Sequence, residues 1–304
     1  MLDAFLEILF KKNEFQRKKL SGFLETTDSI YLDRANEFFV GFDKYLKLRQ
    51  RSRVEAIDSY LSLCNDMIFE QIQFMKTGAY SISTQSEALD SVYNDELRMA
   101  TYMEGLAISQ FFWDSHYKIF DFFLNTLEKN SSNLKDYLEI GPGHGLYLAH
   151  TVNKCLPDSQ ITALDISETS LRLTREIVDL LSTNRVGVNY VVDNVENYSS
   201  EKFFDFITMG EVIEHLDDPK SVLIKIRKML KPNGLSFLTT CVNCPAIDHV
   251  YLFSNVNQIR DMFEAAGLQI LEEIVLPVEK LPMDVIISKK ICINYAAVVK
   301  SKND

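Results

Sequence analysis

The feature that most constrains the fold of this sequence is a change of periodicity near residue 133. From there on, short runs rich in β-branched and aromatic residues alternate with runs of helical spacing. Strands that alternate with helices predict a parallel sheet covered by helices on both faces. Five strands are predicted in this part of the chain: Asp136–Ile140, Gln160–Ile166, Gly187–Asp193, Phe204–Met209 and Leu235–Thr240.

The runs between and after these strands complete an α/β pattern. Thr169–Leu181 and Pro219–Leu230 have helical spacing, and Ser254 is placed to cap a further helix that stops at Gly267. Two final runs are predicted as strands with no helix between them, which favours an antiparallel pair at the edge of the sheet. These runs are Gln269–Val275 and Ile291–Val299.

The part of the chain before residue 133 has a different character. It contains no proline and only four glycines, and its apolar residues recur at helical spacing. Five to seven helices are predicted there, with a looser polar stretch over Gly78–Ser91. The polar cluster Lys129–Asn133 is the predicted boundary. The expected organisation is therefore an all-helical N-terminal domain over residues 1–133 and an α/β domain over residues 134–304.

The composition limits which kinds of partner and which cellular compartment are expected. The formal net charge of −11 disfavours a nucleic-acid partner, because phosphate binding needs a concentrated basic surface. No run reaches the 18 apolar residues of a membrane span, and acidic residues interrupt the N-terminal apolar stretch, so neither a membrane helix nor a signal peptide is expected. We expect a cytoplasmic protein, with a homodimer through the helical domain as a further expectation.

The five cysteines are scattered and odd in number, which is typical of reduced thiols in the cytoplasm. Two of them form a lone C-x-x-C. Zinc would need two further ligands in a similar cluster, so these two are interpreted as packing residues near a strand end. The cysteines are Cys64, Cys155, Cys241, Cys244 and Cys292.

A glycine-rich turn follows the first predicted strand. The segment reads Y-L-E-I-G-P-G-H-G, so Gly141, Gly143 and Gly145 lead from a strand into a helix and allow a ligand to approach the backbone closely. A dinucleotide site would need a glycine where Leu146 stands. The carboxylate of Glu139 would repel a pyrophosphate and suits a ligand with an ammonium group. This pattern favours S-adenosylmethionine over a nicotinamide dinucleotide.

Two further acids end predicted strands. Asp165 closes the second strand, where its carboxylate can accept both ribose hydroxyl protons, and Asp193 closes the third, where it can accept from an adenine amino group. Ligands of open α/β sheets lie beyond the carboxyl ends of the strands, so the three acids are expected to meet in one crevice. Each acid taken alone is also compatible with a solvated turn or a helix cap.

These residues resemble those of the class I, Rossmann-like S-adenosylmethionine-dependent methyltransferases. The similarity covers slightly over half of the chain, in the segments EIGPGHG, ALDIS, DNVE, FDFITMGEVIEHLDDP and LKPNG. The resemblance implies a seven-stranded, mostly parallel sheet with a reversed final strand, preceded here by the helical domain. It also implies that Glu139, Gly141, Gly143 and Gly145 hold the methionine part, that Asp165 and Ile166 flank the ribose, and that Asp193, Asn194 and Val195 border the adenine.

The segment after the fourth strand carries an E-x-x-E-H pattern. Glu211, Glu214 and His215 would share one face of a helical turn, where two carboxylates and an imidazole can hold a divalent metal. The segment resembles that of ubiquinone-pathway O-methyltransferases. It also resembles that of small-RNA 2′-O-methyltransferases, and the second resemblance implies that such residues and a later histidine ligate magnesium. His249 could be that histidine. It could also be a general base or a structural histidine, and E-V-I-E-H also occurs in relatives without metal, so these interpretations stay open.

An aromatic helical region precedes the boundary and suggests where an acceptor binds. Its residues could line an acceptor pocket or pack as core between this helix and the sheet domain. They are Tyr102, Met103, Phe111, Phe112, Trp113, His116 and Tyr117. The sequence thus favours methyl transfer to a small-molecule acceptor, with oxygen preferred. Three alternatives are a carrier-bound or macromolecular acceptor, a non-catalytic cofactor-binding module, and a nicotinamide oxidoreductase.

Overall fold

The computed structural model describes residues 1–304 except 90–94, 185, 201–202 and 303–304. The first part is helical, as predicted, with seven α-helices among the described residues before the first strand. They are α1 (Leu2–Lys12), α2 (Glu14–Leu24), α3 (Ser29–Leu48), α4 (Arg53–Thr77), α5 (Gln85–Ala88), α6 (Glu96–Phe112) and α7 (Asp114–Asn130). Helix α5 lies within the stretch predicted to be looser, of which residues 90 and 91 lie outside the described part.

Seven strands form one sheet. They are β1 (Asp136–Ile140), β2 (Gln160–Asp165), β3 (Val188–Val192), β4 (Phe204–Met209), β5 (Leu230–Val242), β6 (Leu268–Pro277) and β7 (Ile293–Ser301). Their order is β3-β2-β1-β4-β5-β7-β6. Strand β7 runs antiparallel to both of its neighbours, and the other printed pairs are parallel. The predicted mostly parallel sheet with a reversed last strand is therefore confirmed.

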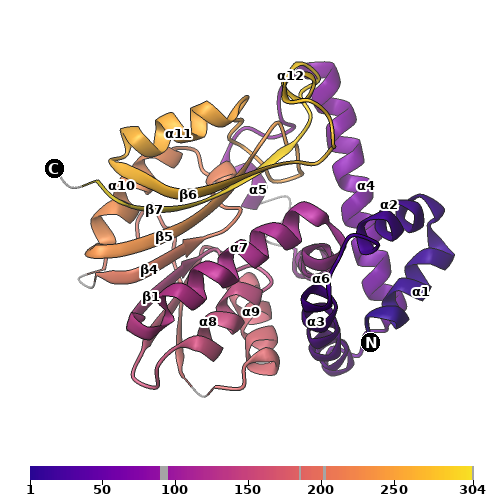
Figure 1. Ribbon diagram of the computed structural model, residues 1–304, viewed down its shortest axis with the longest axis horizontal. Helices are drawn as coiled ribbons and strands as arrows, with labels where there is room; N and C mark the ends of the chain where they lie inside the picture. Colours follow the sequence, from indigo (N-terminus) through magenta and orange to yellow (C-terminus); the bar gives the residue numbers. More distant parts are fainter. Residues whose placement is uncertain (90–94, 185, 201–202, 303–304) are drawn as a thin grey trace.

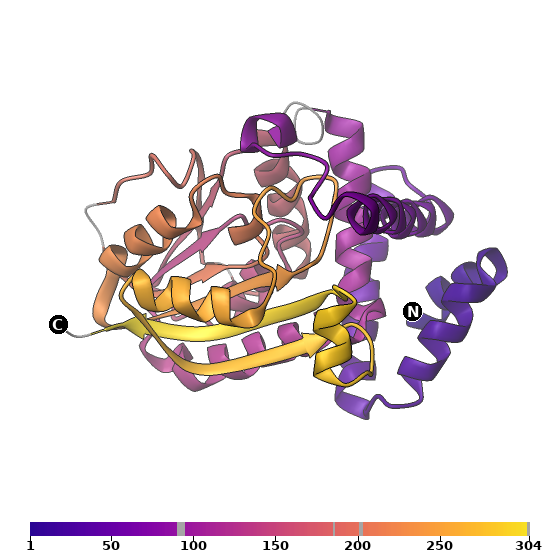
Figure 2. The same ribbon diagram turned by 90° about the horizontal axis from the view of Figure 1, so that it is seen from above.

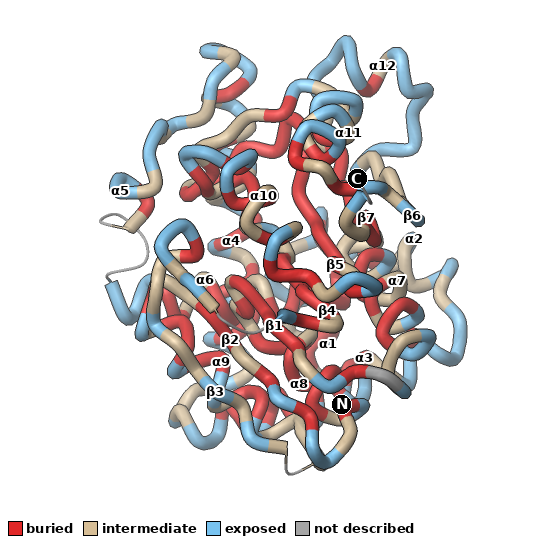
Figure 3. Tube along the Cα trace, turned by 90° about the vertical axis from the view of Figure 1, so that its left-hand side faces the viewer, coloured by how far each residue is buried: buried red, intermediate tan, exposed pale blue. Residues whose placement is uncertain are grey.

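Alternation along the strands creates two apolar layers. In β1, Tyr137 joins the layer with α7, α8 (Leu146–Lys154) and α9 (Glu168–Leu181), whereas Leu138 and Ile140 join the layer with α10 (Pro219–Met229) and α11 (Val256–Ala265). This follows because successive side chains of a strand point to opposite faces. Figure 1 shows α10 and α11 above the sheet and α7, α8 and α9 below it. The central strands are the most buried part of the trace (Figure 3).

Of the N-terminal helices, α7 lies below the sheet, whereas α1 to α4 and α6 stand at one end of it, opposite the C-terminus (Figures 1 and 2). Because β7 is reversed, its C-terminal end marks the amino ends of the parallel strands. Helices α1 to α4 and α6 therefore lie beyond the carboxyl ends, where ligands of open α/β sheets bind. Among the described residues, no helix combines the length and apolar character needed to cross a membrane.

Several sequence-based expectations need correction in detail. A short helix, α12 (Met283–Ser288), lies between β6 and β7, where none was predicted. The antiparallel pairing of these strands is nevertheless confirmed. The cap of α11 is Asn255, whose side chain accepts from the backbone N–H of Gln258, and not Ser254. The predicted aromatic helix is two helices, because Trp113 has extended backbone and separates α6 from α7.

Helix α7 fixes the helical part of the chain to the sheet through aromatic side chains. Phe123 is fully buried and lies 4.5 Å from Tyr147 of α8 and 5.3 Å from Phe237 of β5, measured between ring centroids. Phe120 stacks on the same tyrosine at 5.6 Å. Contacts of this kind add to the free energy gained from apolar burial.

The Phe123→Ala substitution should lower the free energy of unfolding by about 3–5 kcal/mol, because it empties a site between helix and sheet that cannot collapse fully. Denaturant unfolding measures this loss. The matched control is Phe69→Ala on α4, whose side chain is 58% exposed, and it should change the free energy by less than about 1 kcal/mol. Equal losses for the two variants would contradict the packing argument.

Candidate active site

A cavity of about 240 Å³ lies at the carboxyl ends of the parallel strands. One part of its lining comes from the ends of β1, β2 and β5 and from the loops that follow β1 to β5, together with Asn294 of β7, and the other part comes from α4, α5, α6 and α7. Nine residues were predicted to bind the cofactor, and eight of them line the cavity, the exception being Gly145. The eight are Glu139, Gly141, Gly143, Asp165, Ile166, Asp193, Asn194 and Val195. The structure therefore brings together residues that are up to 56 positions apart, between Glu139 and Val195.

The glycine turn has the backbone that its sequence requires. Gly141, Gly143 and Gly145 have φ values of 63°, 50° and 72°, in the left-handed region that side chains with a Cβ rarely adopt. A Cβ on Gly141 would also overlap the side chain of Val212. Gly145 is the N-cap of α8 and does not line the cavity, since the space beside it is filled by Thr174 and Val178 of α9.

Glu139 is buried, with 2% of its surface exposed, and it lines the cavity. The Tyr137 hydroxyl lies 2.6 Å from its Oε2 and 2.8 Å from Oγ1 of Thr208. Burial raises the pKa of Glu139 to about 8, although the bond from Tyr137 opposes this rise. A cation placed in the cavity would restore the charged form of this carboxyl group.

The acids after β2 and β3 meet at the next part of the cavity. Asp165 accepts from the backbone N–H of Ser167 at 2.8 Å and from the hydroxyl of Ser170 at 2.9 Å, and burial raises its pKa to about 6. The N–H of Asp193 donates to the Asp165 carbonyl at 3.0 Å. Asn194 donates to the Gln85 side chain of α5 at 3.2 Å, so the helical part reaches the adenine end of the predicted pocket.

The E-x-x-E-H segment forms a polar cluster in which Glu214 is fully buried, His215 half-buried and Glu211 exposed. Glu211 has φ 51° and its Oε1 accepts from Thr239, while Oε2 of Glu214 accepts from Thr240. Desolvation of the carboxyl groups raises the pKa of both glutamates, and a hydrogen bond joins their side chains. Only Ile213–His215 is helical, as a 3-10 turn, so the predicted shared helical face does not include Glu211.

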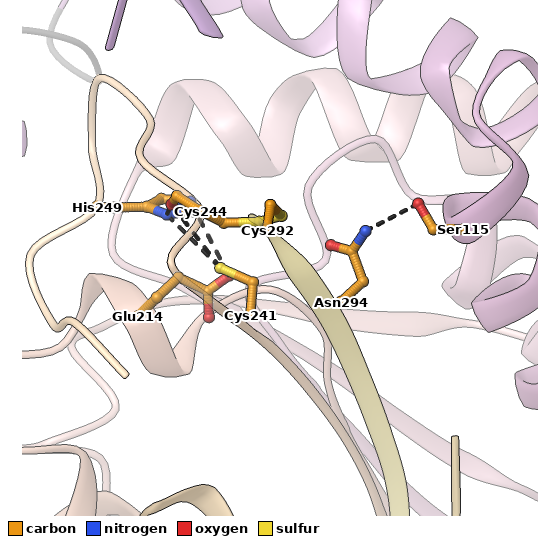
Figure 4. Close-up of a disulfide and its surroundings, with 7 residues drawn as sticks. All are labelled: Ser115, Glu214, Cys241, Cys244, His249, Cys292 and Asn294. Carbon is orange, nitrogen blue, oxygen red and sulfur yellow. Dashed lines mark hydrogen bonds and ion pairs between the residues drawn. A yellow bond between two sulfur atoms is a disulfide. The ribbon is translucent and has the colours of Figure 1, made fainter. Parts of the chain in front are cut away.

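His249 joins this cluster from the loop after β5 (Figure 4). Its Nδ1 lies 2.6 Å from the Cys244 carbonyl oxygen, and a carbonyl can only accept, so Nδ1 carries the proton and Nε2 holds the lone pair. Nε2 lies 4.0 Å from Oε1 of Glu214, and the His215 ring is perpendicular at a centroid distance of 4.9 Å. Burial lowers the pKa of His249 to about 4, which keeps the imidazole neutral at pH 7.

The geometry groups the candidate metal ligands differently from the sequence pattern. Among the described residues there are two sets of three whose donor atoms lie within 4.8 Å of one another inside each set, and His249 belongs to both sets. One set adds Glu214 and the thiol of Cys241, and the other adds His215 and Asp248. Glu211 belongs to neither set, although it lines the cavity beside them. The four predicted ligands are thus neighbours in space: Glu211, Glu214, His215 and His249. The structure adds two candidate ligands that the sequence did not suggest, Cys241 and Asp248.

The expectation that all cysteines are reduced thiols is wrong for two of them. Cys244 and Cys292 form a disulfide, which joins the loop after β5 to the start of β7 (Figure 4). The 48 residues between them hide this proximity in the sequence. Cys64, Cys155 and Cys241 are free and buried. Cys241 packs at the end of β5, as expected of a strand end, but its sulfur also lies 3.8 Å from Nδ1 of His249.

The helical wall supplies the other half of the cavity. Of the predicted aromatic region, Tyr102, Met103, Trp113 and His116 line the cavity, and the remaining three residues pack in the helical core: Phe111, Phe112 and Tyr117. The Tyr102 hydroxyl lies 3.2 Å from Oδ1 of Asp248 and so connects α6 to the loop that carries His249.

Some lining residues were not singled out in the sequence. His144 lies inside the glycine motif and could have been noted there. The others carry no local signal, because only the folded chain brings them to the cavity: Met67, Gln85, Met99, Gln110, Asp248 and Asn294.

Comparisons with known proteins agree with this geometry. Residues 138–236 match the family model described as a methyltransferase domain. The ubiquinone biosynthesis O-methyltransferase of Proteus mirabilis is 31% identical over 121 residues, which are 38% of this chain and 47% of that protein. The malonyl-[acyl-carrier protein] O-methyltransferase 2 of Ilyobacter polytropus is 27% identical over 112 residues, 37% of this chain and 41% of that protein. The chain spans less than half the length of these relatives.

A solved structure extends the likeness beyond the matched segment. The mitomycin 7-O-methyltransferase MmcR has a TM-score of 0.51 to this chain at 11% identity, and the match covers 78% of this chain and 68% of that chain. At this identity the likeness concerns the fold alone. The sheet order, the glycine turn and the sequence matches agree with the fold and cofactor turn expected of a class I, S-adenosylmethionine-dependent methyltransferase. The family match itself covers residues 138–236 of the chain.

The raised pKa of Glu139 predicts a pH-dependent affinity for S-adenosylhomocysteine. The carboxyl group is protonated below its pKa of about 8, and an ammonium ligand binds the charged form better. The dissociation constant should therefore fall by about tenfold or more between pH 6 and pH 8. Calorimetry across this range measures the effect. The Glu139→Gln variant should bind more weakly and without this pH dependence, and an equally steep profile in the variant would contradict the role of Glu139.

Proposed function

We propose that this protein transfers the methyl group of S-adenosylmethionine to a hydroxyl group of a small-molecule acceptor. The observation that carries the proposal is one continuous cavity. Its sheet side has the glycine turn and strand-end carboxyl groups, and its helical side has apolar and aromatic residues beside His249. The region around residues 1–133 acts as the acceptor-binding cover, and the α/β region over residues 134–304 holds the cofactor.

The cofactor residues divide the ligand between three loops. In this proposal Glu139 and the turn over Gly141–Gly145 hold the methionine part, Asp165 and Ile166 the ribose, and Asp193–Val195 the adenine. The fit rests on the left-handed glycines, which leave the backbone accessible, and on the carboxyl groups of Glu139, Asp165 and Asp193, which all line the cavity. Bound S-adenosylmethionine would supply an already activated methyl group, so the main tasks of the protein are alignment and exclusion of water.

His249 is the proposed general base. Its Nδ1–H is held by the Cys244 carbonyl, which leaves the Nε2 lone pair to accept a proton from the acceptor hydroxyl. The neutral form that a base needs is favoured by burial, which lowers the pKa of this imidazole. A fixed tautomer and a neutral ring are both needed for proton acceptance at neutral pH.

Oxygen is the proposed acceptor atom, and a small molecule the proposed substrate. The sequence relatives and the fold relative described above are each named as O-methyltransferases. One relative is named for a malonyl group on a carrier protein, so a carrier-bound acceptor is the alternative substrate class. A non-catalytic module that only binds cofactor is the alternative to an enzyme. Cofactor binding in calorimetry without turnover on any hydroxyl acceptor would favour that module.

The test of the base is His249→Ala. Turnover with a phenolic acceptor should fall by about 10²–10⁴-fold, the usual contribution of a general base, while the affinity for S-adenosylhomocysteine stays within about twofold. Kinetics and calorimetry on the same preparations separate these two effects. His150→Ala is a matched control, since His150 packs on Phe120 and does not line the cavity. Unchanged turnover in His249→Ala would exclude the base.

A divalent metal, with magnesium as the expected ion, is the second candidate for the same cluster. It is favoured by two overlapping sets of donor atoms, one from Glu214, Cys241 and His249 and the other from His215, Asp248 and His249, with Glu211 nearby. The oxygen and nitrogen donors of these sets suit a divalent cation, and the metal would polarise the acceptor hydroxyl. Because a metal and a proton compete for Nε2 of His249, the metal and base mechanisms are mutually exclusive at that atom.

Chelation separates the two mechanisms. If His249 is the base, dialysis against a chelator should leave turnover within about twofold, because no proton transfer in that mechanism depends on a metal. If the cluster holds magnesium, the same treatment should lower turnover by at least about tenfold, and added Mg²⁺ should restore it. Metal analysis of the dialysed protein confirms that the treatment was complete.

A further inference from the structure

The acceptor side of the cavity has an unusual balance of apolar and charged groups. We use the name acceptor lobe for the part bounded by α4, α6, α7 and the loop 243–250. Its apolar lining includes three methionines, Met67, Met99 and Met103, together with Leu106 and Trp113. Methionine side chains are flexible and polarisable, so such a lining adapts to ligands of different outline. The shape of the lobe therefore does not explain selectivity on its own.

The described cavity lining has few groups that can carry a charge on its acceptor side. Among the described residues, none that lines the cavity is a lysine or an arginine. His116 is half-buried and desolvation lowers its pKa to about 3, so it is neutral at pH 7, while the Nδ1–H of His249 is engaged with the Cys244 carbonyl. By contrast, Asp248 is an acid within the lobe, with only 1% of its surface exposed.

Two elements far apart in the sequence hold Asp248 in place. The Tyr102 hydroxyl lies 3.2 Å from its Oδ1, and Nδ1 of His215 donates to its backbone carbonyl at 2.8 Å. Nδ1 of His215 also lies 3.8 Å from Oδ2. A side chain held from both the helical wall and the sheet side has a fixed position, and a fixed carboxyl group discriminates between ligands by charge.

We propose that the acceptor carries no anionic group and is an uncharged or ammonium-bearing, mainly apolar alcohol or phenol, with Asp248 as the residue that sets this selectivity. The inference rests on the proposed methyl transfer and names its substrate class. A carboxylate, phosphate or sulfate brought into the lobe would lose its hydration, would meet no lysine or arginine, and would be repelled by Asp248. An acceptor with an N–H or O–H donor loses water but gains a hydrogen bond to the carboxyl group.

The test uses three phenols that differ only in the para substituent: hydroxymethyl, aminomethyl and carboxylate. Their binding is measured to the protein saturated with S-adenosylhomocysteine, so that no turnover is needed. Trp113 is the single tryptophan of the chain and lines the lobe, so its fluorescence reports binding there. The hydroxymethyl and aminomethyl phenols should bind at least about 100-fold more tightly than the carboxylate, because a buried like-charge pair costs several kcal/mol.

The Asp248→Asn variant removes the charge and keeps an oxygen that can accept from Tyr102. The preference for the ammonium phenol over the carboxylate phenol should fall by at least about tenfold in this variant, with an unchanged affinity for S-adenosylhomocysteine. Tyr102→Phe keeps the carboxyl group and should keep the charge preference. Asp261→Asn changes an exposed acid on α11 by the same chemistry and controls for net charge.

Each outcome decides the proposal. Equal binding of the carboxylate phenol, an unchanged preference in Asp248→Asn, or binding of none of the three phenols would overturn it. The failure of the methyl-transfer proposal is distinguishable, because the phenols would then bind in the expected order while incubation with S-adenosylmethionine yielded no methylated product. If all three phenols were methylated with similar kcat/KM, the methyl-transfer proposal would be supported and the proposed charge selectivity would be refuted.

Discussion

Carboxyl groups close to the ends of parallel strands determine how this molecule can bind ligands. Glu139, Asp165 and Glu211 lie around one cavity, and no lysine or arginine among the described residues contributes to its lining. Desolvation raises the pKa values of all three, which shows that the protein alone does not stabilise their charged forms. A ligand with positive charge and hydroxyl donors supplies what the protein lacks, and S-adenosylmethionine has an ammonium group, a sulfonium centre and a ribose diol.

The helical part of the chain depends on the same constraint. Carboxyl groups at an open sheet end would be hydrated, and their pKa values would stay close to those in water. The wall formed by α4, α5 and α6 covers these carboxyl groups and reduces their hydration. Their charged forms are then less stable unless a cationic ligand is bound. Bonds across the cavity hold the wall in place, from Tyr102 to Asp248 and from Asn194 to Gln85. Aromatic packing of Phe120 and Phe123 on Tyr147 fixes α7 below the sheet.

The sequence predicts the parts of the fold that local patterns determine. The bounds of β1 and β4 match the prediction residue for residue, because both are short central strands rich in aromatic and branched aliphatic residues. Strand β5 begins at Leu230, five residues before its predicted start, because the turn-like segment Lys231–Gly234 is also extended. The break at Trp113 has no glycine or proline to mark it. Helix α12 is too short for a periodic signal and has one buried residue, Ile286.

In the candidate site, too, the residues set by local sequence are predictable and those set by long-range packing are not. The glycine turn and the acids at the ends of β1, β2 and β3 are predictable because the chemistry of one cofactor constrains each local segment. The acceptor lobe is not, since Met67, Asp248 and Asn294 meet only through long-range packing. The disulfide is the clearest case. Its two cysteines are 48 residues apart, and the sequence offers no reason to pair Cys244 with Cys292 while Cys241 stays free.

That disulfide connects the cofactor sheet to the proposed chemistry. The Cys244 carbonyl holds the Nδ1–H of His249 and thereby fixes its tautomer, and the Cys244 side chain is bonded to the segment that enters β7. Two features thus hold the loop after β5 in place. They are the pairing of β5 with β7, which comes before the loop, and the Cys244–Cys292 disulfide within it. Since Asp248 precedes His249 directly, one anchored loop positions both the group proposed to accept the proton and the group proposed to select the acceptor.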